Sequence, residues 1–342
     1  ATGWQGMPAR PESEHLPVFE MAVPPPVVAS VRAAWRWQWQ QLMGGLGPAD
    51  AEGNYCRPAG AFTALPPLPA TAGSSAGHVL IVGRSCPWAH RAWLVWTLRQ
   101  LHSTIDLVVV EPDPGAGRWQ FSSPFEGAQA LADLYRSCGA PAAAPASVPV
   151  LYDRAERRIV VNESARLIEL LNRWPAPDGV SDLEPADQTE RIDAWRQRLQ
   201  GAVNDGVYRC GFARNQAAYD RAEAALFEAL EAAEAELQAA GPWLCGTAPS
   251  LADVVLFPSL IRLELVYAPL FGCSRRPLWQ FPALWRWRAH FHAIEGVAAT
   301  CFPQAWRQDY FGSLFPLHPS GIIPAGPDLT TLVNASPLEM MR

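Results

Sequence analysis

Features that mark several other classes of protein are missing from this sequence of 342 residues. Its seven cysteines are an odd, dispersed set without a CxxC pair, which argues against a secreted disulfide scaffold and against a zinc site. With a formal net charge of -6, the chain lacks a basic field for nucleic acid. No apolar run is long enough to cross a bilayer, and residues 1–20 lack the apolar core of a signal peptide. We therefore expect a cytoplasmic protein with reduced thiols and no nucleic-acid or membrane partner.

The length suffices for two domains, and the first 75 residues differ in texture from the rest. The prolines at 24–26 are expected to prevent regular structure, and residues 28–43 show helical spacing of apolar side chains. Three tryptophans with two arginines in this segment are compatible with a helix on a membrane surface, but we favour a helix docked onto its own domain. Residues 44–76 are rich in Gly, Pro and Ala, which predicts an extended connector.

Residues 76–174 show the element order of a thioredoxin-like domain. The predicted elements are strand 78–82, helix 88–101, strand 105–110, helix 127–137 within an otherwise irregular segment 113–145, strands 148–152 and 158–161, and helix 164–172. This β-α-β, insertion, β-β-α order predicts a parallel crossover unit followed by a hairpin.

Residues 174–182 are rich in Pro and Asp and are predicted to link two domains. From 183 to 327 apolar residues recur with helical period, which predicts an all-helical domain, and residues 328–342 form a C-terminal tail. Ser250, with Asp253 three residues later, predicts a capping box in which the acid satisfies open backbone N–H groups.

The most informative residue is Cys86, which follows the first predicted strand and precedes Pro87. Proline suits the first turn of a helix, so the thiol is expected beside unsatisfied N–H groups at a helix N-terminus. That positive potential, with Arg84, His90 and Arg91 nearby, is expected to lower the thiol pKa and favour the thiolate.

Cys86 has no local resolving thiol, because Ala89 stands where a dithiol oxidoreductase has its second cysteine. It is therefore able to form a mixed disulfide but not an intramolecular one, and a soluble thiol must finish the cycle. Glutathione is the obvious candidate. A buried structural cysteine is the alternative, which the strand-turn-Cys-Pro-helix layout disfavours.

Two further segments supply binding groups. Pro149 lies just before a predicted strand, where a cis-proline of a thioredoxin-like domain places a backbone edge beside the cysteine for the peptide backbone of glutathione. Glu163 and Ser164 open a helix and offer an acid for an ammonium and a hydroxyl for a carboxylate. An ordinary trans proline and a simple helix cap are the alternatives.

Residues 204–219 contain two glycines, each of which costs a helix roughly 1 kcal/mol against alanine. A property other than helix stability therefore selected this segment. Its Tyr208 offers a phenol that donates a proton or holds an oxyanion, whereas Cys210 is interpreted as a packing residue. Tyr310 is a candidate to reach back to the pocket from near the C-terminus, with an ordinary core or surface position as the alternative.

Five motifs, in order along the chain, resemble those of the Xi-class glutathione transferases, the glutathionyl-hydroquinone reductases. They are residues 86–91 (CPWAHR), 148–151 (VPVL), 161–164 (VNES), 204–219 (NDGVYRCGFARNQAAY) and 319–324 (PSGIIP). The resemblance covers about residues 76–327. It implies the glutathione transferase fold, an α/β thioredoxin-like N-terminal domain plus an all-α C-terminal helical domain.

The resemblance also implies residue roles. Cys86 becomes the nucleophile, and Tyr208 and Tyr310 face the quinol. The residues that it implies around glutathione are Trp119, Val148, Pro149, Glu163 and Ser164. Glutathione is then a co-substrate, no metal or bound cofactor is needed, and a homodimer is expected. Residues 144–147 (APAS) lack the basic residue that members often carry there for the glycine carboxylate.

The reaction that the resemblance implies is reductive removal of glutathione from a glutathionyl-hydroquinone. The Cys86 thiolate attacks the glutathione sulfur, Tyr208 or Tyr310 assists the departing ring, and free glutathione releases glutathione disulfide. Two other functions stay open at this point. One is an omega-like thioltransferase or dehydroascorbate reductase, and the other is a non-catalytic binding module built on the transferase fold.

Overall fold

The computed structural model describes residues 23–68, 77–113, 118–142, 144–314 and 317–340. The chain forms two compact units, residues 1–42 and 43–342. Each unit is described by itself, and the candidate site lies wholly within the second. The domain boundaries expected near residues 75 and 183 stay predictions.

Helix α1 (Pro25–Leu46) confirms the helix predicted over residues 28–43. The expectation that the three prolines exclude regular structure is wrong, because the helix begins at Pro25 and proline is well tolerated in a first helical turn. Val31, Trp35 and Trp37 on this helix are exposed. Docking of α1 onto a domain therefore stays a prediction.

The second unit contains a six-stranded sheet with the order β4-β3-β2-β1-β5-β6. Its strands are β1 (His78–Gly83), β2 (Ile105–Asp113), β3 (Arg118–Phe125), β4 (Ala128–Ala130), β5 (Val150–Asp153) and β6 (Arg158–Val161). β1 pairs in parallel with β2 and antiparallel with β5, and β5 pairs antiparallel with β6. The predicted crossover and hairpin are both confirmed.

Strands β3 and β4 occupy a segment that was expected to be irregular, and that expectation is wrong. β3 is mostly exposed and polar, with only Phe121 and Phe125 buried, and its pairing with β4 contains a register shift. A strand that buries so few side chains gives no continuous apolar run in the sequence. The helix predicted in this segment is α3 (Leu131–Ser137).

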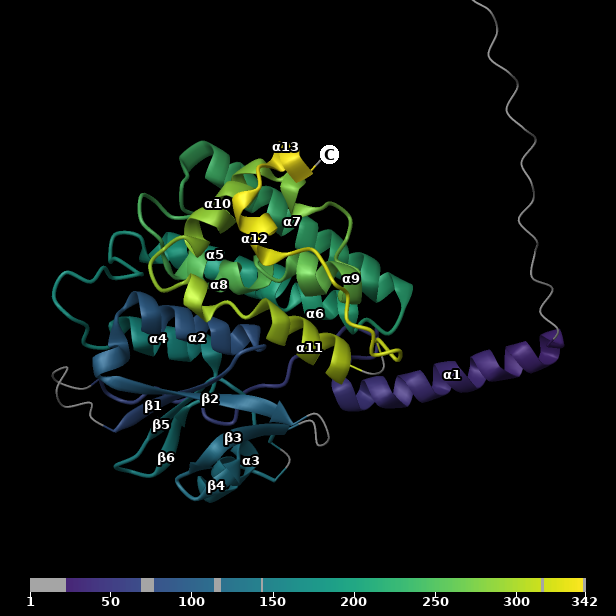
Figure 1. Ribbon diagram of the computed structural model, residues 1–342, viewed down its shortest axis with the longest axis horizontal. Helices are drawn as coiled ribbons and strands as arrows, with labels where there is room; N and C mark the ends of the chain where they lie inside the picture. The colour runs from purple at the N-terminus through teal and green to yellow at the C-terminus, as the bar shows by residue number, and fades with distance from the viewer. Residues whose placement is uncertain (1–22, 69–76, 114–117, 143, 315–316, 341–342) are drawn as a thin grey trace, which may run out of the picture. The chain divides into compact units, whose positions relative to one another are not determined.

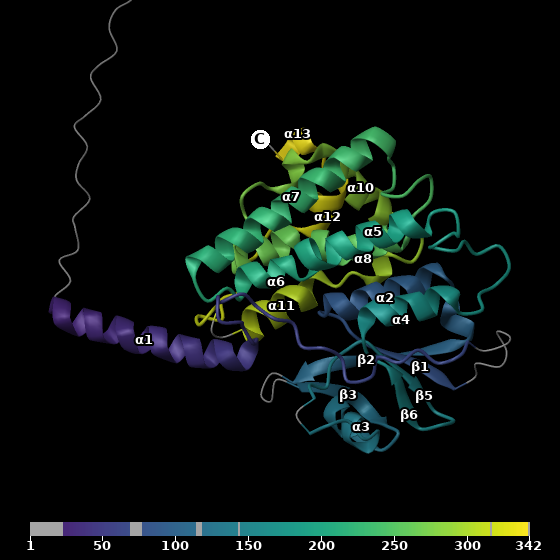
Figure 2. The ribbon, with the colours of Figure 1, turned by 180° about the vertical axis from the view of Figure 1, so that it is seen from behind.

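Two helices separate the sheet from the helical part of the unit. α2 (Pro87–Leu98) and α4 (Ser164–Arg173) lie side by side on one face of the sheet, as Figures 1 and 2 show from opposite sides. β1 lies between β2 and β5, and its residues from Val79 to Val82 are fully buried. The end of β1 and the start of α2 are therefore held in a rigid core.

The rest of the unit is helical, as predicted. Its helices are α5 (Thr189–Leu199), α6 (Gly206–Gly211), α7 (Gln216–Ala240), α8 (Leu251–Leu260), α9 (Ala268–Phe271), α10 (Pro282–His292), α11 (Pro303–Ser313), α12 (Leu329–Asn334) and α13 (Pro337–Met340). The Asp253 carboxylate accepts hydrogen bonds from the backbone N–H and hydroxyl of Ser250, which confirms the capping box at α8.

The segment 204–219 is not one helix. A π-helical turn (Gln200–Asn204) leads into α6, which ends at Gly211, and Asn215 caps the start of α7. A Cβ atom at Gly211 would lie 2.4 Å from the ring of Phe271, so close packing of α6 on α9 selects this glycine.

The expectation that no apolar run could cross a bilayer needs correction. Within the described residues, Leu251–Phe271 is long and apolar enough by length and composition. However, 78% of its most apolar window is buried inside the fold. We therefore interpret it as a core segment.

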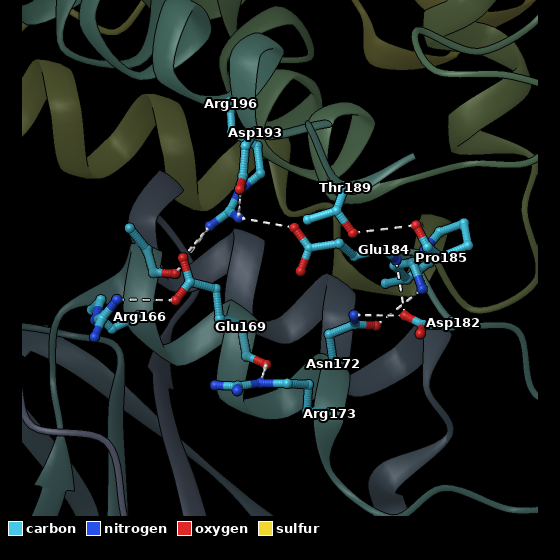
Figure 3. A network of polar contacts seen from close by, with 12 residues as sticks. Arg166, Glu169, Asn172, Arg173, Asp182, Glu184, Pro185, Thr189, Asp193 and Arg196 are labelled. Atoms are coloured by element: carbon cyan, nitrogen blue, oxygen red, sulfur yellow. Dashed lines mark hydrogen bonds and ion pairs between the residues drawn. The ribbon is translucent and has the colours of Figure 1, made fainter. Parts of the chain in front are cut away.

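Arg196 on α5 joins the helical part to α4 (Figure 3). Its guanidinium lies 2.7 Å from the Glu169 carboxylate on α4, 2.9 Å from Asp193 and 3.4 Å from Glu184 in the connecting segment. Nearby, the Asn172 amide donates to Asp182 at 2.8 Å. These contacts fix the junction between α4, α5 and the segment that connects them.

Candidate active site

Cys86 lies between the end of β1 and the start of α2. It is the N-cap residue of α2, with Pro87 in the first turn. The Val148–Pro149 peptide bond is cis, as predicted, and the Cys86 thiol lies 3.5 Å from the carbonyl oxygen of Val148. The fold therefore brings the cysteine, the helix N-terminus and the predicted backbone edge together.

The pKa of the Cys86 thiol corrects one prediction. Burial raises this pKa above its ordinary value, although the backbone N–H groups of Ala89 and Trp88 and the charges of Arg262 and Arg57 lower it. The helix N-terminus acts in the predicted direction, but desolvation outweighs it in the free protein. In the free protein, burial therefore opposes the thiolate, whereas the helix N-terminus and the two arginines favour it.

The cations that were expected to help the thiol are occupied elsewhere. Arg84 pairs with Glu111, and the Arg91 guanidinium donates to Gln200 at 2.9 Å. Burial lowers the pKa of His90 well below its ordinary value, so this imidazole is neutral. The positive charges that act on Cys86 are instead those of Arg262 and Arg57, which the sequence analysis did not identify.

A cavity of about 290 Å³ opens above the thiol. The residues that line it are Ser85, Cys86, Pro87, Pro112, Asp113, Arg118, Trp119, Tyr208, Phe212, Asp309, Tyr310, Ser313 and Leu314. Trp119 reaches the cavity from β3, and its indole lies over Gly83, where a Cβ atom would come within 2.6 Å of the ring. The cavity thus lies between the sheet and the helical part, and four of the predicted site residues line it.

Three tyrosine hydroxyls meet on the helical side of this cavity. The hydroxyls of Tyr208 on α6 and Tyr310 on α11 lie 2.5 Å apart, and that of Tyr267 lies 3.4 Å from Tyr310. Burial raises the pKa of Tyr208 and of Tyr310 well above 10, so both are protonated. Tyr267 was missed because it belongs to an apolar stretch that gives no motif.

Glu163 and Ser164 lie at the N-terminus of α4. The Glu163 carboxylate accepts a hydrogen bond from the backbone N–H of Ala165 at 3.4 Å and lies 3.5 Å from the Arg57 guanidinium. The Ser164 hydroxyl is fully buried, and in the part of the chain that the structure describes it has no hydrogen-bond partner. A buried hydroxyl without a partner at a helix N-terminus is a candidate hydrogen-bond donor to an anionic group of a ligand.

The connector before the sheet also contributes to the site, which no sequence signal indicated. Arg57 lies over the ring of Trp88 at 3.7 Å, and Tyr55 lies 6.3 Å from the ring of Tyr208. Phe62 exchanges hydrogen bonds with Asn162, the residue before Glu163. Residues 43–68 therefore belong to the same compact unit as the cavity and support its rim.

No group of three or more His, Cys, Asp or Glu side chains is placed to hold a metal ion among the residues that the structure describes. Val148, Pro149, Glu163 and Ser164 do not line the cavity itself. They are linked to it through the thiol contact with Val148 and through Arg57, which touches both Trp88 and Glu163.

Comparisons with known proteins agree with this geometry. Residues 85–174 match the family model of the glutathione S-transferase N-terminal domain, and residues 216–290 match that of the C-terminal domain. Glutathionyl-hydroquinone reductase PcpF of Sphingobium chlorophenolicum is 33% identical over 266 residues, which cover 75% of this chain and 84% of the relative.

Solved structures show the same likeness. The glutathione transferase Xi of Phanerochaete chrysosporium superimposes with a TM-score of 0.76 at 31% identity, covering 82% of this chain and 94% of the other. The glutathione-bound structure of YqjG, a glutathione transferase homologue from Escherichia coli K-12, gives 0.67 at 33% identity and covers 74% and 86%. This chain belongs to the Xi-class glutathione transferase family, the family of the glutathionyl-hydroquinone reductases.

Proposed function

We propose that this protein is a glutathione-dependent reductase that removes glutathione from glutathionyl-hydroquinones. The observation that carries the proposal is a single cavity with Cys86 on one wall and the hydroxyls of Tyr208 and Tyr310 on the other. The relative from Sphingobium chlorophenolicum, which is named for this activity, supports the same assignment.

In the first step the Cys86 thiolate attacks the glutathione sulfur of the substrate. A sulfur–sulfur bond forms, the bond between sulfur and the aromatic carbon breaks, and its electron pair passes into the ring. An aryl carbanion is a poor leaving group, so the keto tautomer, already protonated at that carbon, is the form that reacts. Its departing electrons then come to rest on a ring oxygen.

The tyrosine cluster suits the stabilisation of that oxygen. Three hydroxyls joined by two contacts, Tyr208–Tyr310 and Tyr310–Tyr267, use two of their three protons among themselves. The third proton is left for an oxygen of the ring. A donor held in place before the reaction stabilises developing negative charge without reorganisation.

In the second step free glutathione attacks the mixed disulfide on Cys86, which releases glutathione disulfide and restores the thiolate. Cys210 and Cys273 are buried, so neither is positioned as an exposed resolving thiol. In the binding of glutathione, Val148 offers its backbone edge and Trp119 a flat apolar surface. Ser164 offers a free hydroxyl and Glu163 a carboxylate for the γ-glutamyl end.

The experiment that tests the proposal is turnover of a glutathionyl-hydroquinone with glutathione as the only reductant. We expect hydroquinone and glutathione disulfide in equal amounts. Without free glutathione, mass spectrometry should find one glutathione on Cys86, reversed by added thiol. A label on Cys210, or a bridge between Cys86 and Cys210, would show that the monothiol scheme is wrong.

The same assay separates the omega-like alternative. A thioltransferase or dehydroascorbate reductase also uses a cysteine without a local partner, so dehydroascorbate is the competing substrate. Faster turnover of dehydroascorbate than of the quinol thioether would favour that function. A homodimer and a cytoplasmic location are further proposals, and sedimentation of the purified protein tests the first.

A further inference from the structure

Asp309 is an acidic residue that lines the cavity and takes no part in the two reaction steps proposed for Cys86 and the tyrosines. It lies on α11, directly before Tyr310, and lines the same cavity as Cys86 and Trp119. Its side chain is half-buried. It also lines a neighbouring hollow of about 390 Å³ with Arg84 and Glu111, so it stands between the cysteine and a second opening.

A hydrogen bond holds the helix that carries Asp309 against the loop that carries the nucleophile. Ser85, the residue before Cys86, and Asp309 line the same cavity. One turn earlier on α11, the Trp306 indole donates to the backbone carbonyl of Arg84 at 2.9 Å. This contact joins the loop that carries the thiol to the helix that carries the carboxylate.

The carboxylate is not neutralised by a cation. Across the described ranges, no arginine or histidine nitrogen is recorded within ion-pair distance of Asp309, whereas the adjacent Glu111 is paired with Arg84. The other acid of the cavity, Asp113, accepts a hydrogen bond from Gln120 at 2.6 Å. Asp309 thus keeps capacity to accept a hydrogen bond from a ligand, because an ionised carboxylate has two oxygens with about four lone-pair sites.

The proposed reaction needs such an acceptor. Formation of the keto tautomer removes a proton from the ring hydroxyl ortho to sulfur and adds one to the carbon that bears sulfur. Tyr208 and Tyr310 are protonated donors with raised pKa values, so they suit the second transfer but not the first. Burial and the carboxylate of Glu111 raise the pKa of Asp309, although Ser85 lowers it, and a raised pKa makes a carboxylate a better base.

We propose that the Asp309 carboxylate is the proton acceptor for the quinol hydroxyl ortho to sulfur. This inference rests on the proposed function. Asp309 takes the hydroxyl proton while the ring carbon gains a proton through the tyrosine cluster. After Cys86 has attacked sulfur and the carbon–sulfur pair has moved to the ring oxygen, Asp309 returns its proton to that oxygen. The carboxylate ends the cycle unchanged, and the net proton gained by the ring comes from solvent.

The test is Asp309→Asn, which keeps the size of the side chain and removes its negative charge. We expect turnover of the glutathionyl-hydroquinone to fall by roughly 10- to 1000-fold, the usual range for a general base. Reduction of a small glutathione mixed disulfide should stay within twofold, since a thiolate leaving group needs no tautomer. Asp220→Asn, the same chemical change on an exposed residue of α7, should alter neither rate.

Methyl ethers of the substrate make the test specific to one oxygen. Methylation of the hydroxyl ortho to sulfur prevents formation of the keto tautomer, so it should abolish turnover by the wild-type protein, and Asp309→Asn should cause no further loss on this substrate. Methylation of the other hydroxyl should leave the effect of Asp309→Asn intact.

An unchanged quinol rate in Asp309→Asn, or equal losses on quinol and disulfide, would overturn the inference alone. No quinol turnover by the wild-type protein would overturn the proposed function with it.

Discussion

The wall of the cavity that comes from the thioredoxin-like part is polar and incompletely hydrogen-bonded, whereas the helical wall is aromatic and its hydroxyls bond one another. Cys86 lies on the first wall at a helix N-terminus, and behind this wall, at the start of α4, the Ser164 hydroxyl is buried without a partner in the described structure. On the second, Tyr208, Tyr267 and Tyr310 form a continuous hydroxyl chain.

This difference indicates that the two walls of the cavity have different roles. Unsatisfied groups bind a polar partner that arrives with its own charges, so the first wall suits glutathione. A preorganised hydroxyl chain does not need a ligand for its stability, so the second wall is free to respond to charge that develops on a ring. Variants on the first wall should therefore affect every glutathionyl substrate, and variants that remove a hydroxyl from the tyrosine cluster should affect quinols alone.

The largest effect is expected for Cys86→Ser. The serine hydroxyl is far too weak an acid to act as a thiolate, so turnover should be abolished on quinol thioether and mixed disulfide alike. The far-ultraviolet circular dichroism should be unchanged because the side chains are similar in size. Activity within tenfold of the wild type on either substrate would mean that Cys86 is not the nucleophile.

The next largest effect separates the two walls. Tyr310→Phe and Tyr208→Phe each remove one hydroxyl from the chain, and at least one should slow quinol turnover by roughly 10- to 1000-fold. The rate on a small glutathione mixed disulfide should stay near that of the wild type. Equal losses on both substrates would show that the tyrosines support folding or glutathione binding, and the contrast between the walls would then fail.

The first wall and the order of the sheet could be predicted from the sequence because their signals are local. Cys86, its helix and the cis-proline segment lie in short motifs, and β1 is a continuous apolar run. The second wall depends on packing between segments that are far apart in the chain. Tyr267 was therefore missed, and so was Arg57, which sits in a connector without periodicity.

The direction of the thiol pKa shift was mispredicted for the same physical reason. Sequence near Cys86 shows the helix N-terminus and the cations Arg84, His90 and Arg91, but it does not show what covers the thiol. The helical part supplies that cover, and burial is the largest contribution to the shift. It also supplies Arg262, which lies 176 residues after Cys86 in the sequence and which no local pattern connects with it.

The helical part contains two buried arginines, Arg262 and Arg288, which differ in whether an acid is paired with them. Both are fully buried, but Arg288 pairs with the carboxylate of Glu264 at 2.7 Å. Arg262 contacts the neutral His90 ring at 2.9 Å and lies 4.0 Å over Trp306, and the described residues place no acid within ion-pair distance of it. A buried charge without a counter-ion acts strongly on nearby anions, and it lowers the pKa of Cys86 and Tyr310.

Arg262→Gln should therefore weaken the thiolate across the cavity. The pKa of Cys86 rises when this cation is removed, so at a fixed pH below that pKa the thiolate fraction falls. We expect alkylation of Cys86 by iodoacetamide to slow by roughly 3- to 10-fold and its pH profile to move to higher pH. Arg262→Lys introduces a residue type that the chain lacks but keeps the charge, and it should restore most of the rate. If the pH profile of Cys86 alkylation is unchanged in Arg262→Gln, this arginine does not affect the ionisation of Cys86. The influence of the helical wall would then be limited to quinol substrates.

The smallest effect is expected for Ser164→Ala on the glutathione side. The hydroxyl is buried without a partner in the described part of the free protein, so its removal should leave the free energy of unfolding unchanged or slightly higher. If it binds the γ-glutamyl end, the KM for glutathione should rise by roughly 2- to 10-fold with little change in kcat.

Ser259→Ala is the matched control, because that buried hydroxyl accepts a hydrogen bond from Asn204 at 2.8 Å. It should lower the free energy of unfolding by about 1 kcal/mol without altering the KM. Loss of stability in Ser164→Ala with an unchanged KM would show that this hydroxyl supports the helix rather than the ligand, and the proposed polarity of the first wall would lose its main support.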